Sequence, residues 1–173
     1  MQIALDVATG LDYLPSFTSP PHIHKDIKSS NILLDSDFRA KVANLSLARS
    51  VEGADNQFPI TRHIVGTRGY MAPEYLENGL MSTKLGVYAF GVLMQEILTG
   101  KDIDAILSGI VGEECGLERL KEFMDPSLQG NHTLELAMFV IEMTRKCIKK
   151  DPASRSAIHD IVSSLSITLS SCQ

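Results

Sequence analysis

Apolar residues recur at helical spacing in three separate parts of the chain. The first stripe predicts an amphipathic helix over residues 2–14, which Pro15, Pro20 and Pro21 are expected to end. The other two stripes predict helices over residues 136–148 and residues 158–169. The apolar positions of the first stripe are Ile3, Val7, Leu11 and Leu14. The pattern therefore predicts a mostly helical molecule.

A fourth segment, residues 83–99, is apolar on nearly every side. A helix of that kind is buried on most of its faces, so we expect it to be the central helix of the fold, with the other helices packed around it. Ser82 or Thr83 can cap its start, and Gly100 can end it. Beyond it the sequence is irregular, apart from a short predicted helix near residues 117–123.

The β-strand signal is confined to one short region. Residues 32–34 and 40–43 are strand candidates, and the turn-forming residues 35–37 between them predict a small hairpin. Residues 46–70 show no sustained period and predict a long loop. Loops of that length are uncommon unless they are functional.

Composition narrows the class of protein. The 173 residues carry a net charge of −5 and are 44% hydrophobic, which suits one globular domain and excludes a disordered chain. The mild acidity argues against a nucleic-acid partner. We find no apolar run of the ~18–20 residues that a membrane span requires. Three cysteines without a C-x-x-C pair fit free thiols in a reducing, cytoplasmic setting.

The stretch from His24 to Asn31 carries the most chemistry. Asp26, Lys28 and Asn31 place a carboxylate, an ammonium group and a carboxamide within six residues. Such a loop suits phosphoryl transfer: the carboxylate accepts a hydroxyl proton, the lysine faces phosphate charge, and the asparagine binds a metal ion. A solvated polar turn before a strand is the alternative reading of the same eight residues.

Further motifs follow in a characteristic order. They are Ala40–Arg49, Gly66–Tyr75, Val87–Gly91 and Asp151–Arg155. In order and spacing they resemble the C-terminal lobe of a eukaryotic protein kinase of the plant receptor-like Ser/Thr type. Residues 22–26, Asn44 and residues 121–128 are similar to the LysM-type receptor-like kinases.

The resemblance implies a protein-kinase-like (α+β) fold of which this chain holds the C-terminal lobe only. That lobe is mainly α-helical, with a small β-hairpin and a long activation segment. Residues 22–31 would form the catalytic loop, residues 44–74 the activation segment, and residues 83–171 the helical subdomain. The sequence contains no G-x-G-x-x-G and no V-A-I-K motif, so we expect the N-terminal lobe to be absent. A truncated gene, a partial gene model or a fragment would explain this.

The resemblance also assigns roles to the catalytic loop. It implies that Asp26 is the catalytic base, that Lys28 faces the transferred phosphate, and that Asn31 is a metal ligand. His24 is expected to be a structural residue of the same loop. Asn44 would be the second ligand for the cofactor and its metal ion, weakened by its lack of charge.

Four residues outside that loop also receive roles. Glu74 would pair with Arg155 and tie the substrate-binding loop to the lobe. Thr67 lies where Ser/Thr kinases position the substrate hydroxyl. Thr61 is a predicted phosphorylation site in the activation segment.

Several positions depart from the kinase pattern. Asn44-Leu45-Ser46 stands where the family has Asp-Phe-Gly, and the loss of the carboxylate weakens Mg²⁺ binding. Lys25 replaces an arginine and keeps the charge without the bidentate fork. Gly86 replaces an aspartate that accepts hydrogen bonds from the catalytic loop, which predicts a cost of ~1–3 kcal/mol.

The sequence therefore predicts an impaired or inactive kinase fragment that acts in receptor signalling. ATP and Mg²⁺ are the cofactors of the family, and we do not expect this chain alone to bind them well. One alternative is a non-catalytic module that docks another receptor-like kinase; a second is a truncated product without function. We expect a cytoplasmic location, with full-length relatives at the plasma membrane and their kinase domains on the cytosolic side.

Overall fold

A computed structural model gives the fold and describes residues 1–51, 59–101, 124–128 and 133–171. The short helix expected near residues 117–123 lies outside the described residues. The α-helices are α1 (Gln2–Phe17), α2 (Pro73–Asn78), α3 (Lys84–Thr99), α6 (Thr133–Cys147) and α7 (Ile158–Ser171). The β-strands are β1 (His22–Ile23), β2 (Ile32–Leu34), β3 (Ala40–Val42) and β4 (Arg49–Ser50). Single 3₁₀ turns cover Ser29–Asn31, Leu45–Leu47, Pro126–Leu128 and Pro152–Ser154.

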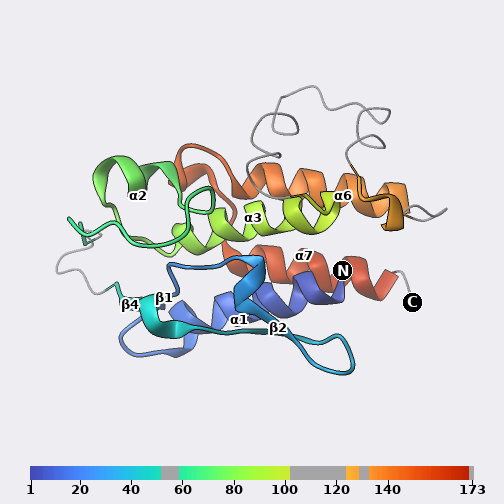
Figure 1. Cartoon of the computed structure of the whole chain (residues 1–173), viewed down its shortest axis with the longest axis horizontal. Helices are drawn as coiled ribbons and strands as arrows, with labels where there is room; N and C mark the ends of the chain where they lie inside the picture. Colours follow the sequence, from blue (N-terminus) through green and yellow to red (C-terminus); the bar gives the residue numbers. More distant parts are fainter. Residues whose placement is uncertain (52–58, 102–123, 129–132, 172–173) are drawn as a thin grey trace.

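The four long helices lie side by side (Figure 1): α3 packs against α6 and α1, and α7 packs against α1. Helix α3 is the central helix that the sequence predicts, because Phe90, Leu93 and Met94 are almost fully buried. It ends at Gly100, which adopts the left-handed conformation with φ 62°. These contacts place the apolar side of each helix in one continuous core.

Helix α1 runs further than the sequence predicts. It continues through Pro15 to Phe17, so the expectation that Pro15 ends the helix is wrong. Pro15 cannot donate to the Leu11 carbonyl, so one hydrogen bond is lost there, but only two residues of the helix follow it. The last four carbonyl groups of the helix lack intrahelical N–H partners in any case. The hydroxyl of Thr18 donates to the Leu14 carbonyl, which satisfies one of these end groups.

The predicted hairpin is confirmed. Strands β2 and β3 pair antiparallel, with Leu33 opposite Lys41. In the turn, Asp35 Oδ1 accepts hydrogen bonds from the backbone N–H groups of Asp37 and Arg39 at 3.0 and 2.9 Å. Helix α1 packs against β3, and this contact attaches the hairpin to the helical part of the molecule.

The predicted loop over residues 46–70 is partly ordered into short elements. Strand β4 pairs antiparallel with β1, and Ile60 forms an isolated bridge with Leu80. Helix α2 then begins at Pro73 and ends at Gly79, whose φ is 66°. A Cβ atom at Gly79 would lie 2.0 Å from the Thr61 carbonyl oxygen, so this close approach requires glycine.

Candidate functional site

His24 lies buried below the loop that follows β1, with 1% of its surface exposed. The backbone N–H of Asp26 donates to His24 Nδ1 at 3.2 Å, and His24 Nε2 lies 2.9 Å from the Ala43 carbonyl oxygen. An acceptor at Nδ1 leaves the proton on Nε2, which then donates to that carbonyl. Burial lowers the pKa of His24, so the neutral ring is favoured. The ring ties residues 24–26 to the end of β3.

Asp26 is buried and has partners at both of its carboxylate oxygens. Thr67 Oγ1 donates to Oδ1 at 2.7 Å, and Asn31 Nδ2 donates to Oδ2 at 3.0 Å. Lys28 Nζ lies 3.4 Å from Oδ2. Burial alone would raise the pKa of Asp26, but the hydrogen bonds from Thr67 and Asn31 and the Lys28 charge lower it below its ordinary value. The side chain is therefore held as a carboxylate.

Thr67 connects the activation segment to this carboxylate. Its hydroxyl accepts a hydrogen bond from Lys28 Nζ at 2.8 Å and donates its own proton to Asp26. The structure thus brings together Asp26, Lys28 and Thr67, although Thr67 lies 41 positions after Asp26. In chemical terms, a hydroxyl lies between an ammonium group and a carboxylate that can accept its proton.

Asn31 and Asn44 meet on the other side of Asp26. Asn44 Nδ2 donates to Asn31 Oδ1 at 3.3 Å, and Ser46 Oγ donates to Asn44 Oδ1 at 2.7 Å. Asn44 itself has a left-handed backbone, with φ 62° and ψ 68°. The side-chain oxygens of both asparagines therefore have hydrogen-bond donors from the chain itself.

Glu74 and Arg155 form a buried bidentate pair. Arg155 Nη1 and Nη2 donate to the two Glu74 carboxylate oxygens at 2.6 and 2.7 Å. Arg155 Nε also donates to the Lys149 carbonyl at 2.7 Å, and its guanidinium lies 5.0 Å from the centre of the Tyr88 ring. The structure joins the start of α2 to the segment before α7, as the resemblance implies.

Thr61 is placed apart from the Asp26 cluster. Its backbone N–H donates to the Gly79 carbonyl at 2.9 Å, and its hydroxyl accepts from the His63 N–H at 3.1 Å. The side chain is partly exposed. Thr61 therefore belongs to the contact between the activation segment and the end of α2.

A second polar cluster was missed by the sequence reasoning. Tyr70 Oη donates to Glu96 Oε2, and Ser29 Oγ donates to Glu96 Oε1 at 2.8 Å. Burial and the neighbouring Glu96 raise the pKa of Tyr70 to about 12. Ser29 and Glu96 are 67 positions apart, and no spacing rule links them. An acidic residue within the apolar helix α3 is the only signal that could have drawn attention to this cluster.

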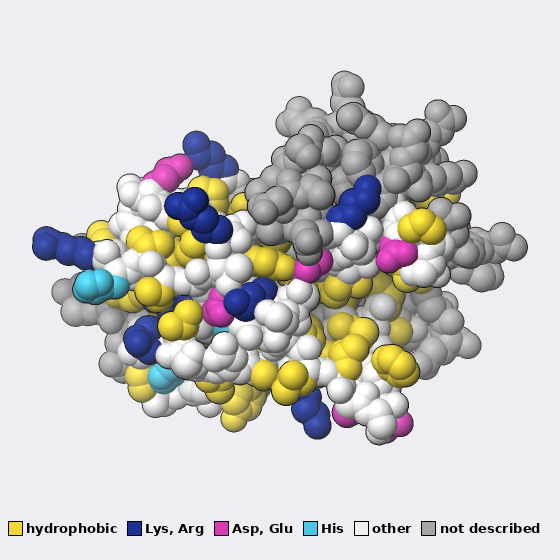
Figure 2. Space-filling view, in the orientation of Figure 1, with side chains coloured by type: hydrophobic (Ala, Val, Ile, Leu, Met, Phe, Trp, Pro, Cys, Tyr) yellow, Lys and Arg dark blue, Asp and Glu magenta, His cyan; other side chains and the backbone are white. Residues whose placement is uncertain are grey.

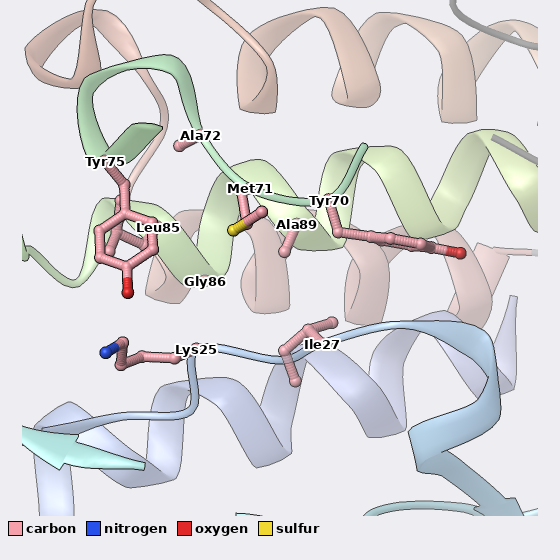
Figure 3. Close-up of a pocket in the computed structure, with 9 residues that line it drawn as sticks. All are labelled: Lys25, Ile27, Tyr70, Met71, Ala72, Tyr75, Leu85, Gly86 and Ala89. Carbon is pink, nitrogen blue, oxygen red and sulfur yellow. The ribbon is translucent and has the colours of Figure 1, made fainter. Parts of the chain in front are cut away.

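Gly86 borders a small cavity between α3 and the catalytic loop (Figure 3). The volume is about 20 Å³, which holds a single water molecule and no nucleotide. The lining residues are Lys25, Ile27, Tyr70, Met71, Ala72, Tyr75, Leu85, Gly86 and Ala89. Lys25 Nζ lies 5.2 Å from the centre of the Tyr75 ring, so this charge faces an aromatic side chain.

Comparison with known families agrees with this geometry. The family described as "Protein tyrosine and serine/threonine kinase" matches residues 1–165. The chain belongs to this protein kinase family, and its mostly helical fold with few strands is that of a kinase C-terminal lobe.

Among individual relatives, the plant LysM receptor-like kinases stand out. The chain is 42% identical to Protein LYK5 of Arabidopsis thaliana over 99% of its own length. It is 38% identical to LysM domain receptor-like kinase 10 of Oryza sativa subsp. japonica over 95%, and 37% identical to chitin elicitor receptor kinase 1 of Arabidopsis thaliana over 99%. It spans 28% to 29% of the length of these three relatives. Within the part of the chain that the structure describes, no helix is long and apolar enough to cross a membrane.

Protein kinases use ATP and Mg²⁺, but Asn31 and Asn44, the two side chains expected to hold the metal, offer that ion no carboxylate. Mg²⁺ prefers charged carboxylate oxygens in an octahedral arrangement. The two side chains that face each other are the neutral carboxamides of Asn31 and Asn44, and each of their oxygens already accepts one hydrogen bond from the chain. Among the described residues there is no group of three or more His, Cys, Asp or Glu side chains that could hold a metal ion.

Proposed function

We propose that this chain is a receptor-like kinase C-terminal lobe that does not transfer phosphate and acts in receptor signalling through contact with another kinase. The donor chemistry at Asn31 and Asn44 supports the first part. The position that should hold a divalent cation offers two neutral amides, and their mutual contact leaves a cation no charged ligand.

The remaining catalytic groups keep their local arrangement in this proposal. Asp26 would be the base, Lys28 the group that faces phosphate charge, and Thr67 the residue that positions a substrate hydroxyl. Their hydrogen bonds connect them to one another, with Thr67 Oγ1 2.7 Å from Asp26 Oδ1. The resulting site holds a proton acceptor in place, but Asn31 and Asn44 give no charged ligand to the divalent cation that phosphoryl transfer requires.

A phosphate-incorporation assay tests this part. The chain is incubated with Mg²⁺ and radiolabelled ATP, beside an Asp26→Asn variant that lacks the proposed base. A matched control is Asp37→Asn, which removes an exposed carboxylate from the hairpin turn. We expect all three proteins to incorporate the same background label. Incorporation that persists in Asp37→Asn and is lost in Asp26→Asn would overturn the proposal.

The docking part is supported by apolar side chains that the lobe leaves exposed around the hairpin. They are Leu33, Leu34, Phe38 and Leu45. Hydrophobic side chains also reach the surface beside lysine and arginine at several places on the face shown in Figure 2. Clustered exposed apolar residues of this kind are typical of interaction sites. A second kinase is the proposed partner, because this chain resembles receptor-like kinases.

Two matched substitutions test the docking surface. Phe38 and Ile167 are each 68% exposed, but Phe38 lies on the hairpin and Ile167 on α7. Phe38→Asn removes the apolar ring and suits the left-handed backbone at φ 56°. In a pull-down with the cytosolic domain of a LysM receptor-like kinase, we expect Phe38→Asn to bind less and Ile167→Asn and Asp26→Asn to bind normally. Equal binding by all variants would argue against the hairpin surface.

Glu74, Arg155, His24 and Thr61 have supporting roles in this proposal. The Glu74–Arg155 pair holds α2, and His24 holds the catalytic loop on Ala43. Phosphorylation of Thr61 would place negative charge next to the contact with Gly79 and could change the order of the activation segment. Mass spectrometry after treatment with a partner kinase would show whether Thr61 is modified.

A further inference from the structure

Four polar side chains form a continuous line of hydrogen bonds through the candidate site. Asn31 Nδ2 donates to the Asp26 carbonyl oxygen at 2.7 Å and to Asp26 Oδ2 at 3.0 Å. Asn44 Nδ2 donates to Asn31 Oδ1 at 3.3 Å, and Ser46 Oγ donates to Asn44 Oδ1 at 2.7 Å. We call these four residues, Asp26, Asn31, Asn44 and Ser46, the amide relay.

The orientation of each amide follows from Asp26. Both acceptors that face the Asn31 side chain from Asp26 are oxygens, so the NH₂ group of Asn31 must point to them. Its carbonyl oxygen then faces Asn44, which must present its own NH₂ group. The Asn44 oxygen is thereby turned toward Ser46, whose hydroxyl has to donate. The direction of every hydrogen bond is set by one carboxylate.

A carboxylate at position 44 could not join this line. An aspartate oxygen in place of Asn44 Nδ2 would face Asn31 Oδ1 at about the same 3.3 Å, with two acceptors and no proton between them. A cation between the oxygens would relieve that conflict. The NH₂ group of Asn44 relieves it without a cation, because it supplies the missing donor itself.

Ser46 completes the relay at its outer end. Its hydroxyl donates to the Asn44 side-chain oxygen and fills one of the two acceptor positions of that oxygen. The left-handed backbone of Asn44 brings residues 44 and 46 close enough for this contact, and asparagine adopts that conformation more readily than most residues. Ser46 therefore holds the Asn44 side chain in the orientation that directs its NH₂ group to Asn31.

We propose that the amide relay takes the place of a divalent cation, so that Asn44 and Ser46 keep the catalytic loop and the start of the activation segment together without Mg²⁺. The inference deepens the proposed function, because it names the residues that make the site independent of metal. A carboxylate at position 44 should therefore make the stability of the fold depend on Mg²⁺.

Thermal unfolding of the full chain tests the relay. The variants are Asn44→Asp and the matched control Asn78→Asp, which adds the same charge at an exposed position at the end of α2. Each is measured in EDTA, in MgCl₂, and in NaCl at equal ionic strength. We expect the wild type and Asn78→Asp to have the same midpoint in MgCl₂ and in NaCl. Asn44→Asp should unfold at a lower temperature in EDTA and recover specifically in MgCl₂.

A wild-type midpoint that rises in MgCl₂ as much as that of Asn44→Asp would overturn the proposal. A second measurement covers the case in which Asn44→Asp does not fold. In the wild type, the side-chain NH₂ resonances of Asn31 and Asn44 should stay sharp when Mn²⁺ is added, and selective broadening of them would also overturn it. Ser46→Ala should shift the Asn44 NH₂ resonances, and no shift would contradict the contact.

These measurements use neither nucleotide nor partner protein. Cation binding at Asn31 and Asn44 would therefore overturn the amide-relay proposal without affecting the docking proposal, which the pull-down tests separately. Conversely, a failed pull-down would leave the relay intact.

Discussion

The Glu74–Arg155 pair and the Asn31–Asn44 contact both join separate segments, but they differ in charge. Glu74 and Arg155 form an enclosed ion pair, in which Arg155 donates to both carboxylate oxygens. Asn31 and Asn44 are neutral and are joined by one longer hydrogen bond of 3.3 Å. Glu74 and Arg155 neutralise each other's charge in the protein interior. Asn31 and Asn44 are neutral, whereas a carboxylate at position 44 would face the Asn31 oxygen and need a bound cation. The Glu74–Arg155 pair therefore maintains the fold, whereas Asn31 and Asn44 lie where the chemistry would take place.

The largest expected effect comes from breaking the charged pair. Arg155→Ala leaves the Glu74 carboxylate buried without its partner, so the free energy of unfolding should fall by ~3–5 kcal/mol. Asn44→Ala removes neutral hydrogen bonds and should cost only ~0.5–1.5 kcal/mol. Urea denaturation of both variants measures the difference. Equal losses would show that the two contacts do not differ as described.

A double variant sharpens this result. Glu74→Ala together with Arg155→Ala removes both charges, so its cost should be smaller than the sum of the two single costs. Simple additivity would mean that the two side chains are not coupled through their ion pair.

Alanine substitutions at two glycines of α3, Gly91 and Gly86, should change the stability by intermediate amounts and in opposite directions. A Cβ atom at Gly91 would lie 2.6 Å from Cys147 Cβ, so Gly91→Ala should destabilise the fold by ~1–3 kcal/mol. At Gly86 the nearest atom is Leu11 Cδ2 at 3.5 Å, an ordinary contact, so Gly86→Ala should stabilise the helix by ~1 kcal/mol. Unfolding midpoints of both variants test this pair. A loss of stability in Gly86→Ala would mean that the cavity beside the catalytic loop is needed.

The smallest expected effect concerns a second charged contact, between α1 and the hairpin. Hydrogen bonds from Arg39 lower the pKa of Asp6 from 3.8 to about 2. Because the folded pKa is the lower one, this contribution to stability is complete above the unfolded value near 4 and is lost as the pH falls toward 2. Asp6→Asn should flatten this part of the stability curve. An unchanged slope between pH 4 and pH 2 would indicate that other carboxylates control it.

The sequence predicted the parts of the fold that depend on local patterns. The all-round apolar character of residues 83–99 was enough to place the buried helix α3, and the turn chemistry around Asp35 was enough for the hairpin. Strands β1 and β4 contain two residues each, which is too short for any periodic signal. Pro15 was misread because the penalty of proline depends on its distance from the end of the helix.

The candidate site divides in the same way. The spacing of Asp26, Lys28 and Asn31 was readable because all three lie on one loop. The hydrogen bond from Ser46 to Asn44 was not predictable, since it depends on the left-handed turn at Asn44. The Ser29–Glu96 contact joins positions 67 apart and arises only when α3 packs beneath the catalytic loop. Contacts of this kind require the tertiary fold.

The separation of 81 residues between Glu74 and Arg155 also has a consequence during synthesis. At ~5–20 residues per second, a ribosome that has completed Glu74 needs roughly 4–16 seconds more to reach Arg155. During that interval the Glu74 carboxylate of α2 has no guanidinium partner. The Glu74–Arg155 pair can therefore form only after most of the chain has been made, and helix α7 follows it.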